Sequence, residues 1–238
     1  MTQISLGDIS VDVIFKDIKN VHLSVHPPAG RVSVAAPERM SLETIRLFAI
    51  LKLDWIKRQK KKMVGQERET PREFVNEETH YLWGKRYRLQ VVSSSTAPVI
   101  EIKHSHLVLK AKSKLLLEKR QQVMAGWYRD VLKTEVAALI VQWAPILEVE
   151  PKQIFVQKMK TKWGSCNASA GSIRFNTELA KKPKECVEYV VVHELMHLIE
   201  PTHNARFVRM MNKAMPNWQI LRDHLNDLPV GYDETKRP

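Results

Sequence analysis

The stretch Val190–Ile199, which reads VVVHELMHLI, places two histidines and a glutamate inside an otherwise apolar run. Residues four apart on an α-helix lie one turn apart on the same face, so His193 and His197 point the same way. Two imidazoles at this spacing can hold one divalent ion, with Glu194 beside them. The apolar neighbours bury the helix, and buried imidazoles and carboxylates need partners. The pattern therefore predicts a metal site on a core helix, rather than three polar residues on a surface helix.

His203 is the candidate third ligand. A catalytic zinc has three protein ligands and one open position. Pro201 ends the helix, so the chain can turn and bring His203 back towards the helix end. The spacing of HELMHLIEPTH is that of the long zinc motif HExxHxxGxxH, with Glu200 in place of its glycine. We interpret Glu200 as a carboxylate that orients a ligand or lies at the surface, and not as a ligand itself.

Several motifs around this segment resemble the YgjP-like family of predicted metal-dependent hydrolases, which is related to the SprT and WLM groups of zinc peptidases. The motifs are WGSC at 163–166, IRFN at 173–176, VVHELMHL at 191–198, and His203 followed by Phe207. The resemblance is specific in the C-terminal half and rests mainly on the arrangement of strands in the N-terminal half. It implies a zincin-like metallopeptidase core, in which the active-site helix packs on a small sheet, with a β-rich N-terminal part. It also implies that the metal ligands are His193, His197 and His203, and that Glu194 is the catalytic base.

The hydrophobic pattern along the chain predicts an α+β protein. Alternation with a period of two before residue 113 indicates strands, with one helix opened by Ser41. From residue 114 the period becomes helical, and Leu115–Leu147 is predicted to form one long helix. We therefore expect a β-rich N-terminal domain with one helix over 1–113 and a zincin-like catalytic domain over 114–238. No internal repeat is evident.

The segment Trp163-Gly164-Ser165-Cys166 has two interpretations. It is either a packed tryptophan followed by a glycine bulge in a strand, or the edge strand that borders the metal site. An edge strand can pair with an extended substrate backbone, which makes Trp163, Gly164 and Ser165 candidate substrate-binding residues. Gly164 would then leave room for the approaching substrate. Cys166 is a weaker candidate for a metal ligand, since three histidines suffice.

Charge points to an anionic partner. The 238 residues carry 38 Lys and Arg against 26 Asp and Glu, which gives a formal charge of +12. The densest cluster comprises Lys57, Arg58, Lys60, Lys61 and Lys62. It is interpreted either as a solvated helix end or as a contact for nucleic acid or a nucleotide.

Other features concern where the protein works. The two cysteines, Cys166 and Cys186, are too few for a disulfide scaffold, and the first residues do not resemble a secretion signal. We therefore expect a cytoplasmic protein. No apolar run approaches the roughly 20 residues that cross a membrane, so no membrane partner is expected. The sequence does not predict an oligomeric state.

The leading hypothesis for function is a zinc-dependent hydrolase of peptide bonds, with one Zn2+ per chain and a peptide or protein as substrate. Other divalent ions fit the same ligands. Zinc would activate a water, and Glu194 would accept its proton and pass it to the leaving amine. Tyr189 and His224 are considered as donors that stabilise the transition state, and neither is assigned.

Two alternatives remain open. One is a metal-dependent nucleotide or phosphoanhydride hydrolase that uses the same site, and the other is a nucleic-acid-associated module with a structural metal. A basic wall around the metal would favour nucleotides, whereas an edge strand would favour peptides. An open coordination position would argue against a structural metal.

Overall fold

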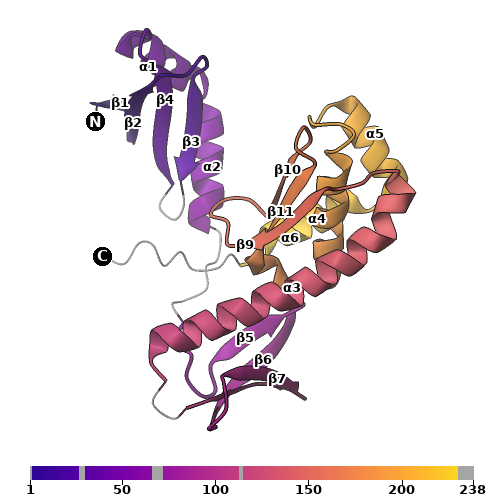
Figure 1. Cartoon of the computed structure of the whole chain (residues 1–238). Coiled ribbons are helices and arrows are strands. Elements are labelled where there is room, and N and C mark those ends of the chain that lie inside the picture. The colour runs from indigo at the N-terminus through magenta and orange to yellow at the C-terminus, as the bar shows by residue number, and fades with distance from the viewer. Residues whose placement is uncertain (1, 27–29, 66–71, 113–114, 230–238) are drawn as a thin grey trace. The chain divides into compact units, whose positions relative to one another are not determined.

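The chain is α+β, as predicted, and it divides into two compact units, Met1–Glu67 and Arg68–Pro238 (Figure 1). The computed structural model describes four stretches, residues 2–26, 30–65, 72–112 and 115–229. Each unit has its own hydrophobic core. The division falls after residue 67, and not at the predicted boundary of 113/114. The reason is that strands between residues 79 and 111 share the core of the second unit.

The first unit is a four-stranded sheet with two helices. Its strands run in the order β1-β2-β4-β3, with β2 and β4 parallel and both outer pairs antiparallel. The elements are β1 (Thr2–Leu6), β2 (Ile9–Lys16), β3 (His22–His26), β4 (Arg31–Pro37), α1 (Leu42–Leu51) and α2 (Leu53–Gly65). The backbone N–H of Thr44 donates to the Ser41 hydroxyl at 3.2 Å, so Ser41 opens α1 as predicted. The chain leaves helical geometry at Lys52, so two helices stand where one is predicted.

The second unit begins with another four-stranded sheet, in the order β5-β6-β8-β7. Its strands are β5 (Thr79–Leu82), β6 (Lys85–Ser93), β7 (Val99–Lys103) and β8 (His106–Ala111). The long helix α3 (Leu117–Leu147) follows and runs from this sheet to the next one (Figure 1). Met124, Tyr128 and Leu132 of α3 are buried in the same core as the sheet residues Leu89 and Leu107. This packing joins the sheet to the C-terminal half of the chain.

The two four-stranded sheets have the same topology. In each, an antiparallel hairpin is followed by a parallel central pair and a second antiparallel pair, and a helix comes next. The first hairpin of each turns at a glycine with positive φ, which is 63° at Gly7 and 76° at Gly84. The chain therefore contains one strand arrangement twice, a repeat that is not evident in the sequence.

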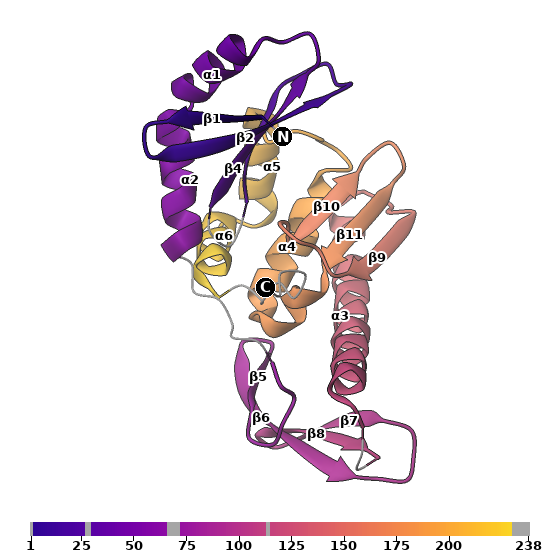
Figure 2. The same ribbon diagram turned by 90° about the vertical axis from the view of Figure 1, so that its left-hand side faces the viewer.

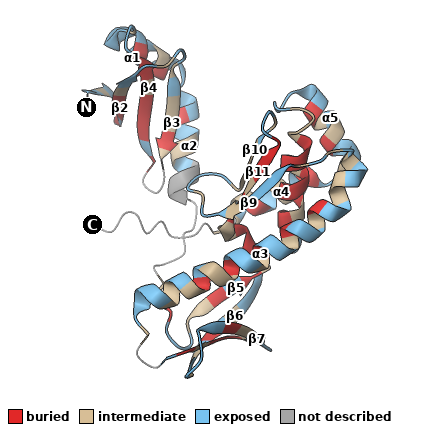
Figure 3. Ribbon diagram, viewed as in Figure 1, coloured by how far each residue is buried: buried red, intermediate tan, exposed pale blue. Residues whose placement is uncertain are grey.

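A small sheet and four helical segments complete the second unit (Figure 2). The sheet has the order β10-β11-β9, which places β10 at an edge. The elements are β9 (Gln153–Gln157), β10 (Gly164–Asn167), β11 (Ser172–Asn176), the 3-10 helix η1 (Thr177–Lys181), α4 (Lys184–Met196), α5 (Ala205–Ala214) and α6 (Trp218–Asp227). Pro183 takes the N-cap position of α4. Most of α4 is buried, whereas α3 and α5 each expose one side (Figure 3). Within the described stretches, no helix has the length and apolar character needed to cross a membrane.

Candidate metal centre

Three imidazoles meet at the end of α4. His193 lies in the last turn of α4, His197 caps its C-terminus, and His203 lies just before α5. The Nε2 atom of His193 is 3.2 Å from that of His197 and 2.9 Å from that of His203, and the latter two are 3.0 Å apart. The predicted ligands are therefore brought together, and each ring turns the same nitrogen inwards.

The protonation of these rings fits a shared cation. Nδ1 of His197 lies 3.0 Å from the carbonyl oxygen of Glu200, and a carbonyl only accepts, so Nδ1 donates. In the neutral ring this leaves the lone pair on Nε2, as a metal ligand requires. Burial, with the neighbouring imidazoles, lowers the pKa of His193 to about 3. The pKa of His203 is also lowered, first by burial and then by His197. At neutral pH these two rings are uncharged and offer lone pairs.

Phe207 supports all three rings from α5. Its ring centroid lies 5.0 Å from that of His193, 4.8 Å from that of His197 and 4.9 Å from that of His203. The side chain is only 1% exposed. Asn204 accepts a hydrogen bond from the Phe207 backbone N–H at 3.0 Å and so caps the start of α5. Of the two motif residues, His203 is therefore the ligand candidate, and Phe207 packs against its ring.

Glu200 contributes through its backbone. Its carboxylate accepts hydrogen bonds from the hydroxyl of Thr202 at 3.0 Å and from the N–H of Thr202 at 3.4 Å. Arg206 lies 3.7 Å from the other oxygen. The hydrogen bond from Thr202 is the first cause that lowers the pKa of Glu200. The group that orients His197 is thus the Glu200 carbonyl, whereas the sequence interpretation considered the carboxylate.

Glu194 is buried between α4 and β10. Its side chain is 5% exposed, and Oε2 has no hydrogen-bond partner among the described residues. Burial raises the pKa of Glu194 to about 8, while the positive charge of Lys162 acts in the opposite direction. An unpartnered buried carboxyl next to three convergent imidazoles is consistent with a site built for a further group.

Gly164 gives the Glu194 carboxyl its space. A Cβ atom at Gly164 would lie 2.6 Å from Oε1 of Glu194 and 2.8 Å from its carboxyl carbon, so any side chain there would force the Glu194 carboxyl to move. The sequence interpretation reserved this space for the substrate. In the structure the catalytic-base candidate occupies it, because α4 packs directly against β10.

The other residues of this segment have ordinary packing. The half-buried Trp163 packs on the core of the second unit, with Nζ of Lys182 5.6 Å from its ring centroid. Ser165 and Cys166 are half-buried in β10. Burial, followed by the charge of Glu194, raises the pKa of the Cys166 thiol to about 11. Cys166 remains a protonated thiol near neutral pH, and it is not part of the histidine cluster.

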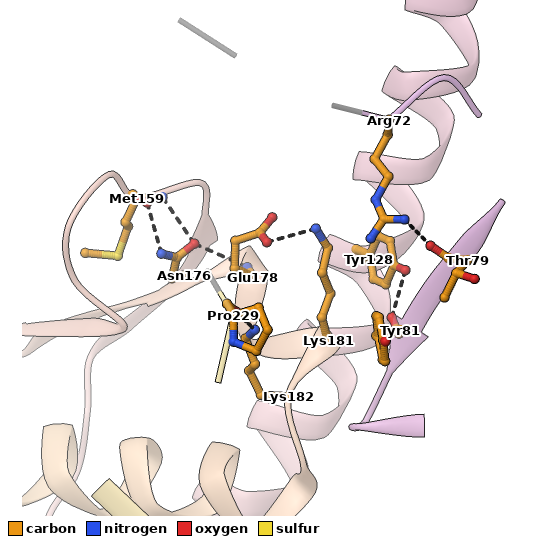
Figure 4. Close-up of polar contacts among 10 residues, drawn as sticks. All are labelled: Arg72, Thr79, Tyr81, Tyr128, Met159, Asn176, Glu178, Lys181, Lys182 and Pro229. Carbon is orange, nitrogen blue, oxygen red and sulfur yellow. Dashed lines mark hydrogen bonds and ion pairs between the residues drawn. The ribbon is translucent and has the colours of Figure 1, made fainter. Parts of the chain in front are cut away.

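Asn176 holds the loop that leads into β10, a role that the sequence analysis did not assign (Figure 4). Its Oδ1 accepts from the backbone N–H groups of Met159 at 3.3 Å and Glu178 at 3.2 Å. Its Nδ2 donates to the carbonyl oxygens of Met159 at 3.0 Å and Lys162 at 2.8 Å. The side chain is 5% exposed and uses both its donor and its acceptor group. An asparagine at the end of a strand with buried neighbours is the signal that could have indicated such a role.

Figure 4 also shows how η1 is attached to its surroundings. Lys181 pairs with Glu178 at 2.8 Å and lies over the ring of Tyr128, whose hydroxyl donates to the Tyr81 carbonyl at 2.8 Å. Lys182 donates to the carbonyl of Pro229. These contacts link η1 to α3 and β5 and fix the segment between β11 and α4.

The sequence matches the family model for the YgjP-like metallopeptidase domain over residues 19–228, which is most of the chain. The chain belongs to the YgjP-like family. The resemblance seen in the sequence motifs is thereby confirmed, and the chain carries a metal-dependent peptidase domain.

Two solved structures of metallopeptidase zymogens are similar to part of this YgjP-like chain. The structure of the metallopeptidase zymogen abylysin from Pyrococcus abyssi is 21% identical, with 40% of this chain and 99% of that chain covered, at a TM-score of 0.36. The zymogen of jannalysin from Methanocaldococcus jannaschii is 19% identical, with 40% and 86% covered, at a TM-score of 0.33. These TM-scores are too low to establish a common fold. No curated protein sequence matches the chain significantly.

The remaining candidates of the YgjP-like chain lie in different places. Tyr189 is 6% exposed, packs edge-on against His193 with centroids 5.7 Å apart, and stacks on Trp218. Burial raises its pKa to about 12. Nδ1 of His224 lies 3.9 Å from the Cys186 sulfur, near the start of α4. Tyr189 therefore borders the histidine cluster, whereas His224 contacts the opposite end of the helix.

The basic cluster, interpreted from the sequence as either a solvated helix end or an anion contact, lies on α2 of the first unit. Lys57, Arg58 and Lys61 are exposed there, and Lys60 is half-buried beside Gly30. The side chain of Lys62 lies outside the described residues. The exposure of these groups fits both interpretations of the cluster, the solvated helix end and the anion contact.

Proposed function

We propose that the chain is a zinc metallopeptidase with a zincin-like core, formed by α4 and the small sheet of β9, β10 and β11. The observation that carries the proposal is the convergence of three histidine Nε2 atoms within 3.2 Å beside the buried carboxyl of Glu194. Four groups of this kind on one helix and the segment after it are the parts that hydrolysis by a metal-activated water requires.

His193, His197 and His203 would hold one zinc ion through their Nε2 atoms. Three protein ligands are the usual number at a catalytic zinc and leave a coordination position for water or substrate, which argues against a purely structural metal. When bound, zinc lowers the pKa of water and polarises the scissile carbonyl. The Glu200 carbonyl keeps Nε2 of His197 unprotonated, and Phe207 keeps the three rings in register.

Glu194 would act as the general base. In the metal-free protein burial raises the pKa of this carboxyl to about 8, which gives it a higher proton affinity than an exposed glutamate, as a general base near neutral pH requires. In peptide hydrolysis the carboxylate takes a proton from the attacking water and delivers it to the leaving amine. Contact with the Gly164 backbone holds the carboxyl beside the edge strand, where a bound substrate would lie.

The edge strand β10 would align the substrate. Among the described strands it pairs only with β11, so its other edge is available for an extended peptide backbone. Gly164 and Ser165 would contribute backbone groups, and Trp163 would flank them. Hydrolysis of nucleotides is kept as the second candidate, because exposed lysines precede β10 close to Glu194.

Metal content and activity test the proposal together. We expect that His193→Ala, His197→Ala and His203→Ala each lower the zinc content, measured by elemental analysis. Glu194→Gln should retain zinc and lose peptide hydrolysis by about 100- to 10,000-fold. Full zinc occupancy in His203→Ala would remove that residue from the ligand set. Hydrolysis of nucleoside triphosphates without peptide cleavage would replace the peptidase by the second candidate.

A further inference from the structure

We propose that the loop before β10 makes the site selective for acidic peptides, with Lys160 and Lys162 binding a carboxylate side chain of the substrate. This inference rests on the proposed peptidase function and assigns its substrate class. The two lysines belong to the segment Lys158–Lys162, which enters β10 beside the Glu194 carboxyl.

The loop is fixed in place. Nδ2 of the buried Asn176 donates to the carbonyl of Lys162 at 2.8 Å and to that of Met159 at 3.0 Å. Figure 4 shows the contact with Met159. The backbone on either side of Lys160 is therefore tied to the end of β11. Lysines carried by a fixed backbone lose less conformational entropy on binding than lysines on a mobile loop.

The two ammonium groups have no carboxylate of their own. Lys160 and Lys162 are exposed, and neither forms an ion pair or a side-chain hydrogen bond with the residues that the structure describes. The backbone N–H of Glu178 donates a hydrogen bond to Asn176 Oδ1, but the Glu178 carboxylate forms an ion pair with Lys181 at 2.8 Å. Gly164, two residues after Lys162, abuts the Glu194 carboxyl, which places the backbone of this lysine next to the candidate reaction centre.

The turn at the opposite end of β10 has no charged side chain of its own, although Lys152 lies beside it at Gly171. There the chain turns through Asn167–Gly171, which reads NASAG. Asn167 uses its Oδ1 within the turn, accepting from the Ser169 hydroxyl at 2.7 Å and the Ala170 N–H at 3.1 Å. A peptide paired with β10 would thus meet the exposed Lys160 and Lys162 at the end that begins with Gly164, and a turn without charged residues at the other end, where Lys152 lies beyond the strand at Gly171. Since Gly164 abuts Glu194, the cationic end is the one nearest the scissile bond.

Paired peptides test this selectivity on the zinc-loaded full chain. The two peptides of a pair differ only by Glu or Gln at one position near the scissile bond. Some pairs vary a position before this bond, and others a position after it. We expect kcat/KM to be about 5-fold higher for Glu than for Gln on one side only, mainly through KM, as two exposed ion pairs would give. The preference should disappear in about 1 M salt. Lys160→Gln and Lys162→Gln should each lower the Glu/Gln ratio, whereas the matched control Lys133→Gln on α3 should not.

Binding separates this inference from the proposed function. The Glu194→Gln variant should bind a fluorescent Glu peptide more tightly than the Gln peptide in anisotropy titrations, and adding Lys160→Gln should remove the difference. Equal cleavage of both peptides by the wild type, or an unchanged ratio in the lysine variants, would overturn the selectivity. If lysine-dependent binding is found and no peptide is cleaved, the selectivity stands and the hydrolytic function fails. If neither is found, both fail.

Discussion

Glu194 illustrates a conflict between stability and function within one side chain. The carboxyl is 5% exposed, and its Oε2 has no hydrogen-bond partner among the described residues. Burial disfavours the charged form, so the pKa rises from 4.5 to about 8. The folded protein without metal therefore holds a proton that the unfolded chain has already released. Between about pH 4.5 and about pH 8 its free energy of unfolding falls as the pH rises.

Glu194→Gln should therefore stabilise the metal-free protein while abolishing activity. Glutamine does not titrate, so the gain should be small near pH 5 and grow to about 4 kcal/mol near pH 8, at about 1.36 kcal/mol for each pKa unit. Thermal melting of the chelator-treated proteins at several pH values measures it. Glu150→Gln, at an exposed position, is the control and should show no such trend. A difference in Tm that is constant with pH would contradict a raised pKa at Glu194.

Asn176→Asp should destabilise the loop that leads into β10. Aspartate keeps the acceptor oxygens and loses the donor group, which leaves the carbonyls of Met159 and Lys162 without their partner. We expect a loss of about 2 kcal/mol or more in the free energy of unfolding, together with lower kcat/KM.

Asn212→Asp provides the matched control for this substitution. Asn212 accepts from the Trp218 indole N–H at 2.7 Å, and aspartate retains that acceptor. Equal stability losses at the two positions, measured by urea denaturation, would contradict the role given to the Asn176 donor group.

Residues within one helix were predictable, and contacts between elements were not. The spacing of His193 and His197 follows from helix geometry alone, and the turn after Pro201 favoured His203 as the third ligand. The contact of Gly164 with Glu194 could not be predicted, because it depends on how closely α4 approaches β10. The substrate-binding role of Gly164 stays a prediction. The roles of Asn176 and Phe207 depend in the same way on tertiary contacts that no local pattern contains.

At the level of elements, α5 contributes as much to the metal centre as α4. Phe207 in its first turn contacts all three imidazoles, and Asn204 fixes the start of the helix. The segment between α4 and α5 brings His203 against the Phe207 ring of α5, next to the other two imidazoles. Helix α5 therefore provides the apolar surface against which the three imidazole rings pack.

Phe207→Leu should weaken metal binding more than it weakens the fold. A leucine keeps much of the apolar volume and lacks the flat ring, so we expect about a 10-fold loss of zinc affinity, the lower end of the effects seen when groups supporting metal ligands are changed. The core cost should be about 1–2 kcal/mol. Zinc titration against a competing chelator measures the affinity, and thermal melting the stability.

Phe175→Leu is the comparison variant for this experiment. Phe175 of β11 is fully buried in the same core as Phe207, with no ring contact to the three histidines in the described structure. It should lower Tm to a similar extent and leave the zinc affinity unchanged. Equal losses of affinity in both variants would mean that general loosening of the core, and not the Phe207 ring, governs the site.

The sequence predicted most strands and helices, but not how they group. Alternating residues indicated the strands before residue 113, and Ser41 marked a helix start correctly. The change of period near residue 114 was mistaken for a domain boundary. The period of the hydrophobic pattern reports local secondary structure. A domain boundary depends on which apolar faces pack together. Here the apolar residues of β5–β8 pack against α3, so both belong to one unit.

For the whole molecule, the two separate cores predict independent folding. We expect residues 68–238 alone to form a folded protein that binds one zinc ion as the full chain does, because all candidate ligands and the core around them lie in this unit. Circular dichroism, melting and zinc stoichiometry of the truncated chain measure this. Aggregation of 68–238, with metal binding restored only when residues 1–67 are present, would contradict independence of the cores.

The duplicated strand order affects how the nascent chain reaches this structure. Two sheets of the same topology present similar edges, so a strand of one can compete for a place in the other during refolding from denaturant. Synthesis from the N-terminus removes much of this competition, because β1–β4 can pair with one another before β5–β8 have left the ribosome. The order in which the two copies are translated thus protects the later copy, to which the metal-binding helix is attached.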